Sequence, residues 1–403
     1  MSVSARSSRL PAMDILRGLA IVFMALDHAR DFTSNISFEP EDLTHTFPAL
    51  FFTRWVTHYS APVFFFLAGT GAYLMLSRTG SIRAVSRFLW TRGLWLILVE
   101  FTIVWFAWTF LFPGHLFGVL ASLGVSMILL AALIRLPIPW LAGISLLVIC
   151  AHDLLDPITV HSVGSLGWIW ALLHARTVVV LPVINWPTFV LFPLIPLAFV
   201  MSAGFAFGTV MSRSTEERVR IAAVIGCAAT VSFLILRGFN LYGNPAAAFA
   251  ASSPGPWHPR GTLAMSVVSF LDVEKYPTSL QFLLMTLGPA LILLAVVDRV
   301  TSRGRVPTLL RPILVFGQVP FFFYVLHLFV IHLAAIGIFV TIGAPIGWLL
   351  HGGFFAAQPP AGLGLSLPEV WLFWLAVVAA LYFPCAAFAR YKKLHDDWWL
   401  SYL

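Results

Sequence analysis

The chain has 403 residues, of which 60% are hydrophobic and only 10% carry a charge. A soluble domain normally has about 25% charged residues, and most of its surface must stay hydrated. These proportions exclude a soluble globular protein. Closed β-barrels show short alternating segments rather than runs of about 20 apolar residues, and such runs are present here. The sequence therefore predicts an all-α fold, namely a polytopic bundle of transmembrane helices.

Apolar runs of membrane-spanning length recur along the whole chain, and they predict about ten spans. The expected spans are residues 11–28, 48–76, 87–112, 116–135, 138–152, 188–211, 219–237, 279–299, 312–342 and 368–390. Residues 1–403 are expected to form a single transmembrane domain, with 153–187 and 238–278 as extracytoplasmic loops. Within the first loop, Ser165–Pro182 is apolar enough to be re-entrant or interfacial, although Arg176 argues against an ordinary crossing.

The basic residues are spread between the apolar runs, so the net charge of +7 indicates membrane topology rather than a nucleic-acid surface. With ten spans, 17 of the 24 lysines and arginines fall on the side of the N-terminus. The positive-inside rule makes that side cytoplasmic, which places both termini there. A cleavable signal peptide is not expected, because Asp14 and Arg17 lie within the first apolar run.

The three cysteines lie inside or at the ends of apolar runs, and none of them forms a CxxC pair. They are Cys150, Cys227 and Cys385. This pattern predicts buried, inert thiols rather than a disulfide or a metal site.

The first span carries charges that an ordinary membrane helix lacks. Asp14 and Arg17 are three residues apart, so they share one helix face and can pair. Arg17 and His28 are eleven residues apart, which is about 16 Å along the axis and nearly the same face. An intramembrane charge is costly unless it is paired or faces a cavity. The helix therefore contains either a structural ion pair with a helix-end histidine or a polar line across the membrane.

Most of the 12 histidines lie at the predicted extracytoplasmic side of the bundle. His28, His45 and His58 follow one another closely, with Asp31 and further carboxylates between them. A histidine with a carboxylate nearby is a suitable general base, so these four are the candidate catalytic residues. Each histidine alone also fits a structural role at the membrane interface.

Two later segments carry polar residues next to long apolar runs. Asp272 and Lys275 precede the eighth span. Gln318, Tyr324 and His327 lie within the ninth span, where buried polar groups need partners. Hydrogen bonding between helices and contact with a ligand are both open for these residues.

Several of these segments form blocks that occur together in a known family. The blocks are Asp14-x-x-Arg17-Gly18, the His28 helix end, Ala61-Pro62-Val-Phe-Phe-Phe-Leu-Ala-Gly69, Arg92-Gly93-Leu-Trp-Leu, Phe-Leu-Asp-x-x-Lys-Tyr-Pro-x-Ser-Leu at 270–280, and Gly317…Pro320-Phe-Phe-Phe-Tyr324…His327. Together they resemble the heparan-alpha-glucosaminide N-acetyltransferase catalytic-domain family of membrane acyltransferases, most closely its bacterial members. The Arg17-x10-His28 spacing is also similar to the first span of bacterial acyltransferases that decorate surface polysaccharides.

The resemblance implies an acyltransferase-like domain in a bacterial inner membrane. Its donor would be acetyl-CoA from the cytoplasm, and its acceptor an amino sugar or other glycan on the opposite side. By order and distance from the following Pro-Val-Phe helix, His45 is the best match to the family's loop histidine, with His28 and His58 as rivals.

On the hypothesis of acyl transfer, the remaining polar residues are candidates for binding the donor or the acceptor. The residues expected to bind acetyl-CoA are Arg17, Asp14, Gln318, Tyr324 and His327, and those expected to contact the acceptor are Asp272 and Lys275.

Other functions remain open at the level of sequence. A transporter of a small polar solute would also need intramembrane Asp, Arg and His residues. A non-catalytic membrane subunit is a third alternative. The expected partners are the lipid bilayer, acyl-CoA and the glycan acceptor, with no nucleic acid and no metal, and a homodimer is one assembly that the sequence leaves open.

Overall fold

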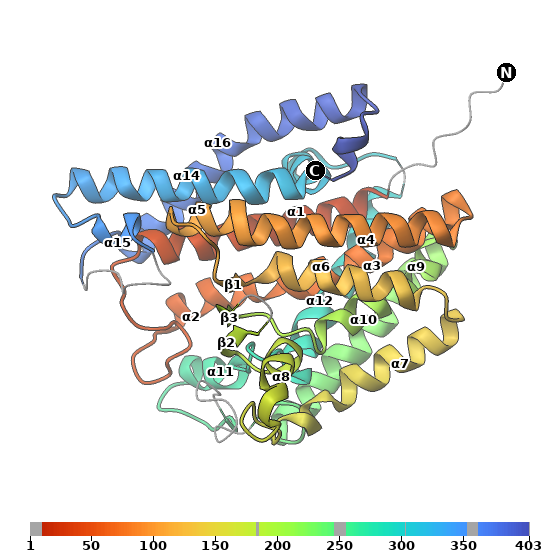
Figure 1. Cartoon of the computed structure of the whole chain (residues 1–403), viewed down its shortest axis with the longest axis horizontal. Coiled ribbons are helices and arrows are strands. Elements are labelled where there is room, and N and C mark those ends of the chain that lie inside the picture. The colour runs from red at the N-terminus through yellow and green to blue at the C-terminus, as the bar shows by residue number, and fades with distance from the viewer. Residues whose placement is uncertain (1–9, 183–184, 246–254, 303, 353–361, 403) are drawn as a thin grey trace.

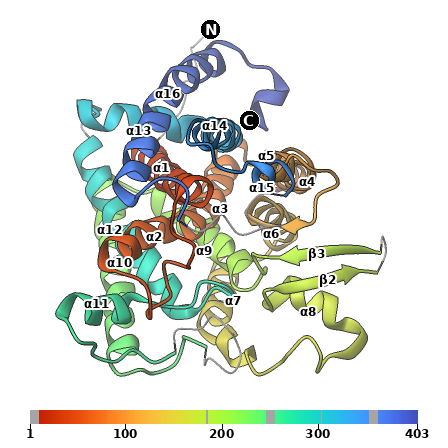
Figure 2. The same ribbon diagram turned by 90° about the vertical axis from the view of Figure 1, so that its left-hand side faces the viewer.

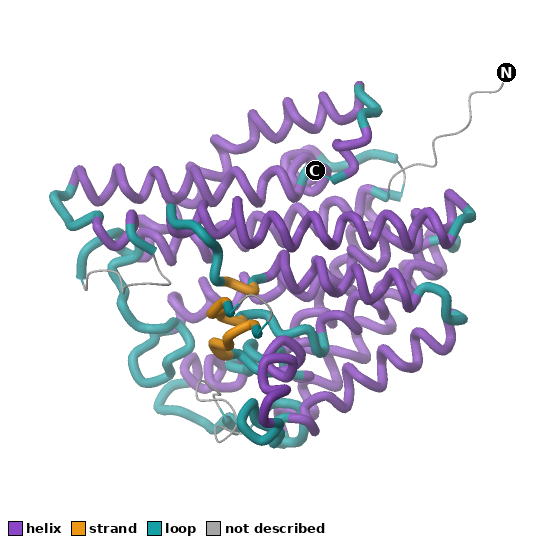
Figure 3. The backbone as a smooth tube through the Cα atoms, in the orientation of Figure 1, coloured by secondary structure: helices purple, strands orange, loops and turns teal. Residues whose placement is uncertain are grey.

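The computed structural model describes residues 10–182, 185–245, 255–302, 304–352 and 362–402, and most of them are helical (Figure 3). In chain order the helices are α1 (Pro11–Thr33), α2 (Pro48–Trp55), α3 (Ser60–Thr79), α4 (Ile82–Val99), α5 (Trp105–Thr109), α6 (Val119–Leu133), α7 (Ile138–Ala151), α8 (Gly167–His174), α9 (Leu197–Met211), α10 (Thr215–Gly238), α11 (Leu263–Leu271), α12 (Leu280–Thr301), α13 (Arg311–Gln318), α14 (Pro320–Thr341), α15 (Gly347–Leu350) and α16 (Leu367–Leu394). A 3₁₀ turn, Val56–Tyr59, joins α2 to α3, and a π-helical turn, Glu100–Val104, joins α4 to α5. The strands are β1 (Leu116–Phe117), β2 (Thr177–Leu181) and β3 (Trp186–Val190).

Each of the ten expected spans contains a helix, which confirms the predicted helical membrane bundle. Seven helical segments are long and apolar enough to cross a membrane: Pro48–Thr79, Ile82–Thr109, Ile138–Leu155, Thr215–Gly238, Leu280–Thr301, Pro320–Thr341 and Leu367–Leu394. Helices α6 and α9 are apolar but shorter, and α1 has 23 residues but several charges. The number of spans and the cytoplasmic placement of the termini stay predictions, and residues 1–9 lie outside the described part of the chain.

Two of the expected spans are wrong in detail. The range 188–211 begins with strand β3 and a turn, and its helix starts only at Leu197. The range 312–342 is divided into α13 and α14 at Val319, whose ψ of 49° is not helical. Pro320 explains this break, because a proline ring clashes with a helical residue before it and has no N–H to donate.

A small three-stranded sheet lies beside the helices, in the order β1-β3-β2. Strand β2 lies in the expected loop 153–187, whereas β1 and most of β3 fall in ranges that were expected to be membrane spans. Strand β2 is antiparallel to β3, and β1 is parallel to it. The β-branched run Thr177–Val180 favours a strand. The apolar part of the segment 153–187 therefore forms α8 and β2, and Val179 packs against Ala171 of α8 and Phe117 of β1.

The second predicted loop, 238–278, contains α11 and is tied to the bundle by a buried arginine. The side chain of Arg237 is 1% exposed and donates hydrogen bonds to backbone carbonyls on both sides of α11. Residues 246–254 of this loop lie outside the described part of the chain. The described residues fold back over the end of α10 rather than projecting away from it (Figure 1).

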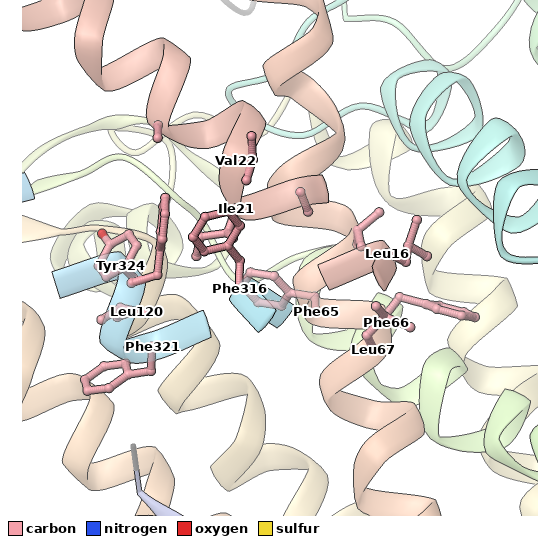
Figure 4. Close-up of a cluster of buried hydrophobic side chains, with 14 of the residues drawn as sticks. Leu16, Ile21, Val22, Phe65, Phe66, Leu67, Leu120, Phe316, Phe321 and Tyr324 are labelled. Atoms are coloured by element: carbon pink, nitrogen blue, oxygen red, sulfur yellow. The ribbon is translucent and has the colours of Figure 1, made fainter. Parts of the chain in front are cut away.

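Helix α1 runs through the middle of the bundle, surrounded by α3, α12, α13, α14 and α16 (Figure 2). Its apolar face packs into the main core, where Ile21 of α1, Phe65 of α3 and Phe316 of α13 belong to one cluster (Figure 4). The turn between α3 and α4 and the start of α1 lie at one end of the bundle, and α2 and α15 lie at the other (Figure 1). The charged residues of α1 are therefore placed inside the protein, away from lipid.

The cysteines are free, as expected, but two of them are not buried. Cys385 is buried, whereas Cys150 and Cys227 are exposed on the outer surface of the described chain. An apolar helix position can face lipid as well as the core, so hydropathy does not distinguish the two.

Candidate active site

A cavity of about 1420 Å³ lies along α1. Its wall includes Leu10 and Arg17 near the start of that helix and His28 and Asp31 near its end. At 1.5 Å per residue, these positions extend over about 30 Å of helix. The cavity therefore connects the two ends of the bundle, and both of the polar groups expected on α1 face it.

The end of the cavity near the start of α1 is basic. Its cationic wall residues are Arg17, Arg78, Arg92 and Lys392. Arg17 is fixed by two contacts, since its guanidinium nitrogens lie 3.0 Å from Asp14 Oδ1 and 3.2 Å from the Leu67 carbonyl oxygen. The predicted pairing of Asp14 with Arg17 is thus present, and the pair faces a cavity rather than lipid.

Two further residues expected to bind the donor line the same cavity. Tyr324 is 6% exposed, and Gln318 lies next to the break between α13 and α14. The Oε1 atom of Gln318 is buried and has no hydrogen-bond partner among the described residues. An unpaired buried amide oxygen is costly, so it is suited to accept a hydrogen bond from a ligand.

His28 on the cavity wall pairs with His327, which is 299 residues away in sequence, fully buried and not itself a wall residue. His327, which was expected to bind the donor, is therefore placed behind His28 instead. Nδ1 of His28 lies 2.7 Å from Nε2 of His327, and Nδ1 of His327 lies 3.0 Å from the Phe323 carbonyl oxygen. A carbonyl oxygen only accepts, so Nδ1 of a neutral His327 carries the proton and its Nε2 accepts. His28 must then donate through Nδ1, which leaves its Nε2 with an unprotonated lone pair. The pair therefore sets the tautomer that a general base needs.

The opposite end of the cavity carries a network of ion pairs. Asp27 pairs with Arg30, at 2.8 Å, and with Arg54. Arg30 also lies 2.6 Å from Asp31, and Arg54 lies 2.7 Å from Glu41. These groups are largely shielded from water, where removing one partner of a pair leaves an uncompensated charge. The network holds the segment between α1 and α2 over this end of the cavity.

Beyond this network, an aromatic ring at the cavity wall is flanked by two cations. The guanidinium carbon of Arg176 lies 5.2 Å from the ring centre of Tyr276, and Nζ of Lys275 lies 5.0 Å from the same centre. All three residues line the cavity. Lys275, which was expected to contact the acceptor, is therefore at the site.

The other two candidate histidines do not line the cavity. The side chain of His45 is 65% exposed and lies 2.6 Å from Asp42 Oδ2. Hydrogen bonds from Thr44 and His45 hold the pKa of Asp42 at about 2. His58 is buried, with Nε2 3.3 Å from Glu41 Oε1. His58 thus supports the ion-pair network, and His45 lies on the surface beside it.

Asp272 is also placed away from the cavity wall. It is 4% exposed at the end of α11, and its backbone oxygen accepts a hydrogen bond of 2.6 Å from Arg237. Burial raises the pKa of Asp272 to about 8 and that of the neighbouring Glu274 to about 7. Asp272 is thus tied into the loop through its backbone oxygen and does not line the cavity.

These raised pKa values predict a pH-dependent stability. The folded state favours the protonated carboxyls, so their contribution is complete below about pH 4 and is lost progressively as the pH rises from there to about 8. We expect the melting temperature of the wild type to fall across this window. The melting temperature of the variant Asp272→Asn, whose side chain stays neutral, should fall less over the same pH range. Thermal unfolding measured from acid to alkaline pH tests this expectation. An equal fall of the melting temperature with pH in the two proteins would contradict it.

Glu100 is a wall residue that was not among the candidates from the sequence. It is 1% exposed in the π-helical turn after α4, and Oε2 accepts backbone hydrogen bonds of 2.6 Å from Leu120 and 3.1 Å from Ala121. A carboxylate at a helix N-terminus satisfies unpaired N–H groups and the helix dipole. Glu100 is the only acidic residue in the span expected at 87–112, so the sequence could have identified it as a candidate.

Replacing Glu100 with alanine is expected to lower the free energy of unfolding by about 1–3 kcal/mol, because buried donors lose their acceptor. Thermal unfolding in detergent measures this change. Glu369→Ala is the control, because Glu369 also accepts a backbone hydrogen bond at a helix start, from Ser366 N–H, but is exposed, so water replaces it. An equal loss in both variants would show that burial of Glu100 is not the cause.

The family of the chain follows from a comparison with known sequences. Residues 9–238 match the sequence model of the heparan-alpha-glucosaminide N-acetyltransferase catalytic domain. The chain belongs to this family. A search of curated proteins found no match. The matched range covers α1 to α10 and more than half of the chain, and it contains Arg17, His28 and Glu100.

Membership of this N-acetyltransferase family confirms the family resemblance, whereas the blocks at 270–280 and 317–327 lie outside the matched residues. Together with the apolar helices, it makes the protein an integral, multi-pass membrane protein with an acetyltransferase domain. It does not favour the transporter alternative. Among the described residues, no group of three or more His, Cys, Asp or Glu residues is arranged to hold a metal ion.

Proposed function

We propose that this protein transfers an acetyl group from cytoplasmic acetyl-CoA to an amine or hydroxyl of a glycan-type acceptor on the other side of the membrane. The observation that carries the proposal is the continuous cavity along α1, with His28 on its wall and the buried His327 behind it. A donor and an acceptor that enter from opposite ends of such a cavity can meet without crossing lipid. The bacterial inner membrane is its proposed location.

In this mechanism, Nε2 of His28 takes the proton from the acceptor amine or hydroxyl as that group attacks the thioester carbonyl carbon. A bond forms between the acceptor atom and the acyl carbon, and the bond from carbon to sulfur breaks. The proton then passes from His28 to the departing CoA thiolate. His327 holds the reacting tautomer through its bond to the Phe323 carbonyl. A covalent route through an acetylated His28 uses the same lone pair and would leave label on the protein without acceptor.

The basic end of the cavity is the proposed donor site. Coenzyme A carries several phosphate charges, and arginine binds phosphate through paired, charge-assisted hydrogen bonds. Arg17, Arg78 and Arg92 supply such groups at this end, and Asp14 orients Arg17. Gln318 lies further along the wall, where its free oxygen suits an amide N–H of the donor's pantetheine arm.

The opposite end is the proposed acceptor site. The ring of Tyr276 offers an apolar face for a sugar, and Lys275 and Arg176 beside it bind polar or negative substituents. Asp31 also lines this end and is proposed to contact the acceptor rather than to act as the base. In place of the direct roles expected from sequence, His45, His58 and Asp272 are assigned to support the surrounding segments.

The test is a transfer assay in proteoliposomes. Labelled acetyl-CoA is supplied at the end where α1 begins, and candidate amino sugars are enclosed on the other side. We expect label to appear on an acceptor and free CoA to be released in equal amount. Correctly folded protein that neither binds CoA nor moves label would refute acyl transfer, and solute flux independent of acetyl-CoA would favour the transporter alternative instead.

A further inference from the structure

A second hollow lies on the outside of the bundle, at the start of α4. It is a groove of about 650 Å³, and none of its lining residues belongs to the main cavity. Its lining residues are Ile82, Arg83, Ser86, Arg87, Trp90 and Arg135. Half of this wall is arginine, which is unusual for a surface that faces the membrane.

Helix α4 separates the two hollows. Phe88 and Arg92 point to the main cavity, whereas Arg83, Arg87 and Trp90 line the groove. Residues three or four apart in a helix share a face, so these three form one continuous stripe. The groove is therefore distinct from the proposed donor site, although both lie at the same end of the bundle.

Tight packing of α4 against α6 brings the third arginine to this stripe. Side chains added at Gly93 or at Gly124 would each lie 2.5 Å from the backbone oxygen of the other residue, so the two helices touch directly. Ser86 Oγ donates a hydrogen bond of 2.8 Å to the Ala131 carbonyl, next to the end of α6. Arg135 follows that end, and both views show α4 and α6 side by side (Figures 1 and 2).

Among the described residues, no acidic side chain pairs with the three arginines. Arg83, Arg87 and Arg135 are exposed, and none of them forms an ion pair with a described residue. Three positive charges around one groove repel one another unless an anion lies between them. The planar guanidinium groups suit a phosphate, which they bind through paired hydrogen bonds.

The stripe continues from the groove along α4 as exposed apolar residues. Trp90, Leu94 and Leu98 are 49%, 48% and 55% exposed, and they follow Arg87 on the same face. The order along the helix is therefore arginine, tryptophan and then leucine. That order matches a lipid headgroup, the membrane interface and acyl chains, because tryptophan favours the interface and leucine the hydrocarbon core. A free phosphate ion would not contact the apolar part of the stripe.

We propose that this groove binds the phosphate of an anionic phospholipid, with the acyl chains lying along Trp90, Leu94 and Leu98. The positive-inside rule accounts for arginines at this end of the bundle, but it does not require them to converge on one groove. The lipid would bridge α4 and α6, both of which line the main cavity.

Native mass spectrometry of the detergent-purified protein tests the site. We expect phosphatidylglycerol to stay bound to the wild type and phosphatidylcholine to be lost. The triple variant Arg83→Gln, Arg87→Gln, Arg135→Gln should bind phosphatidylglycerol about 10–100-fold more weakly, given the contribution of each arginine near an anionic surface. The control Arg220→Gln, Arg299→Gln, Arg305→Gln removes three exposed charges outside both hollows and should bind like the wild type.

Two further measurements separate the remaining outcomes. The variant Arg83→Lys, Arg87→Lys, Arg135→Lys keeps the charge that sets topology but loses the guanidinium geometry, so it should show an intermediate loss. Inorganic phosphate should not displace the lipid at millimolar concentration, and displacement would assign the groove to free phosphate instead. Equal lipid binding by the glutamine variant and the control, with equal melting temperatures in detergent, would overturn the proposal.

Discussion

Replacing His28 with alanine is expected to lower the rate of acetyl transfer by about 10²–10⁴-fold, the usual contribution of a general base. His28 is the one candidate histidine whose ring faces the cavity and whose tautomer is set by a partner. The loss should appear in kcat, while binding of acetyl-CoA at the basic end of the cavity stays close to that of the wild type. Single-turnover transfer with labelled acetyl-CoA measures the first quantity and equilibrium binding the second.

His45→Ala is the matched control for this experiment. His45 was the best sequence match to the family's loop histidine, but it is 65% exposed and lies outside the cavity wall. We expect this variant to retain most of its activity. The reverse result, with His45 essential and His28 dispensable, would mean that the segment between α1 and α2 closes over the cavity during the reaction, and it would refute the assignment of His28 as the base.

A methyl group added at Gly317 is expected to destabilise the fold by about 1–3 kcal/mol, because a tightly packed site cannot take extra volume. An added Cβ would lie 1.6 Å from the Asp14 carbonyl oxygen. On the facing helix, an added Cβ at Gly18 would lie 2.0 Å from the Ile313 carbonyl oxygen. Both close contacts involve backbone, so α1 and α13 must move apart to accept Gly317→Ala. The melting temperature in detergent should fall, and Gln318 should be displaced from the cavity wall.

Gly337→Ala provides the comparison, because an added Cβ there meets nothing within 4 Å. Alanine also favours a helix over glycine by roughly 0.5–1 kcal/mol, so this variant should be neutral or slightly more stable. Should Gly317→Ala melt at the same temperature as Gly337→Ala, close approach of α1 and α13 would not be what holds this part of the bundle together.

The spans could be predicted from the sequence because the hydropathy of a segment shows directly whether that segment is more stable in lipid or in water. A run of about 20 apolar residues has few stable alternatives to a membrane helix. The small sheet was missed because β1 has only two residues and its partner β3 lies about 70 residues later. Short strands depend on distant partners, which periodicity within one segment cannot reveal.

The candidate site was predicted only in part. The pairing of Asp14 with Arg17 and the shared face of Arg17 and His28 follow from helix geometry within one segment, and the structure places these residues on one cavity wall. The choice among the three histidines did not follow, since order along the chain says nothing about which ring faces a cavity. Glu100 was missed, although a single carboxylate in an apolar span is a recognisable signal.

The sequence alone determined the class of protein, the helical nature of its spans and the shared face of Asp14, Arg17 and His28 on α1, because each of these properties is local to one segment. The family resemblance, carried by short blocks, was also readable there. Only the tertiary structure placed His327 against His28, 299 residues away, and so fixed which nitrogen of His28 is unprotonated. It also gathered Arg83, Arg87 and Arg135 at one groove. Such properties belong to contacts between distant helices, and those contacts are set by how the whole bundle packs.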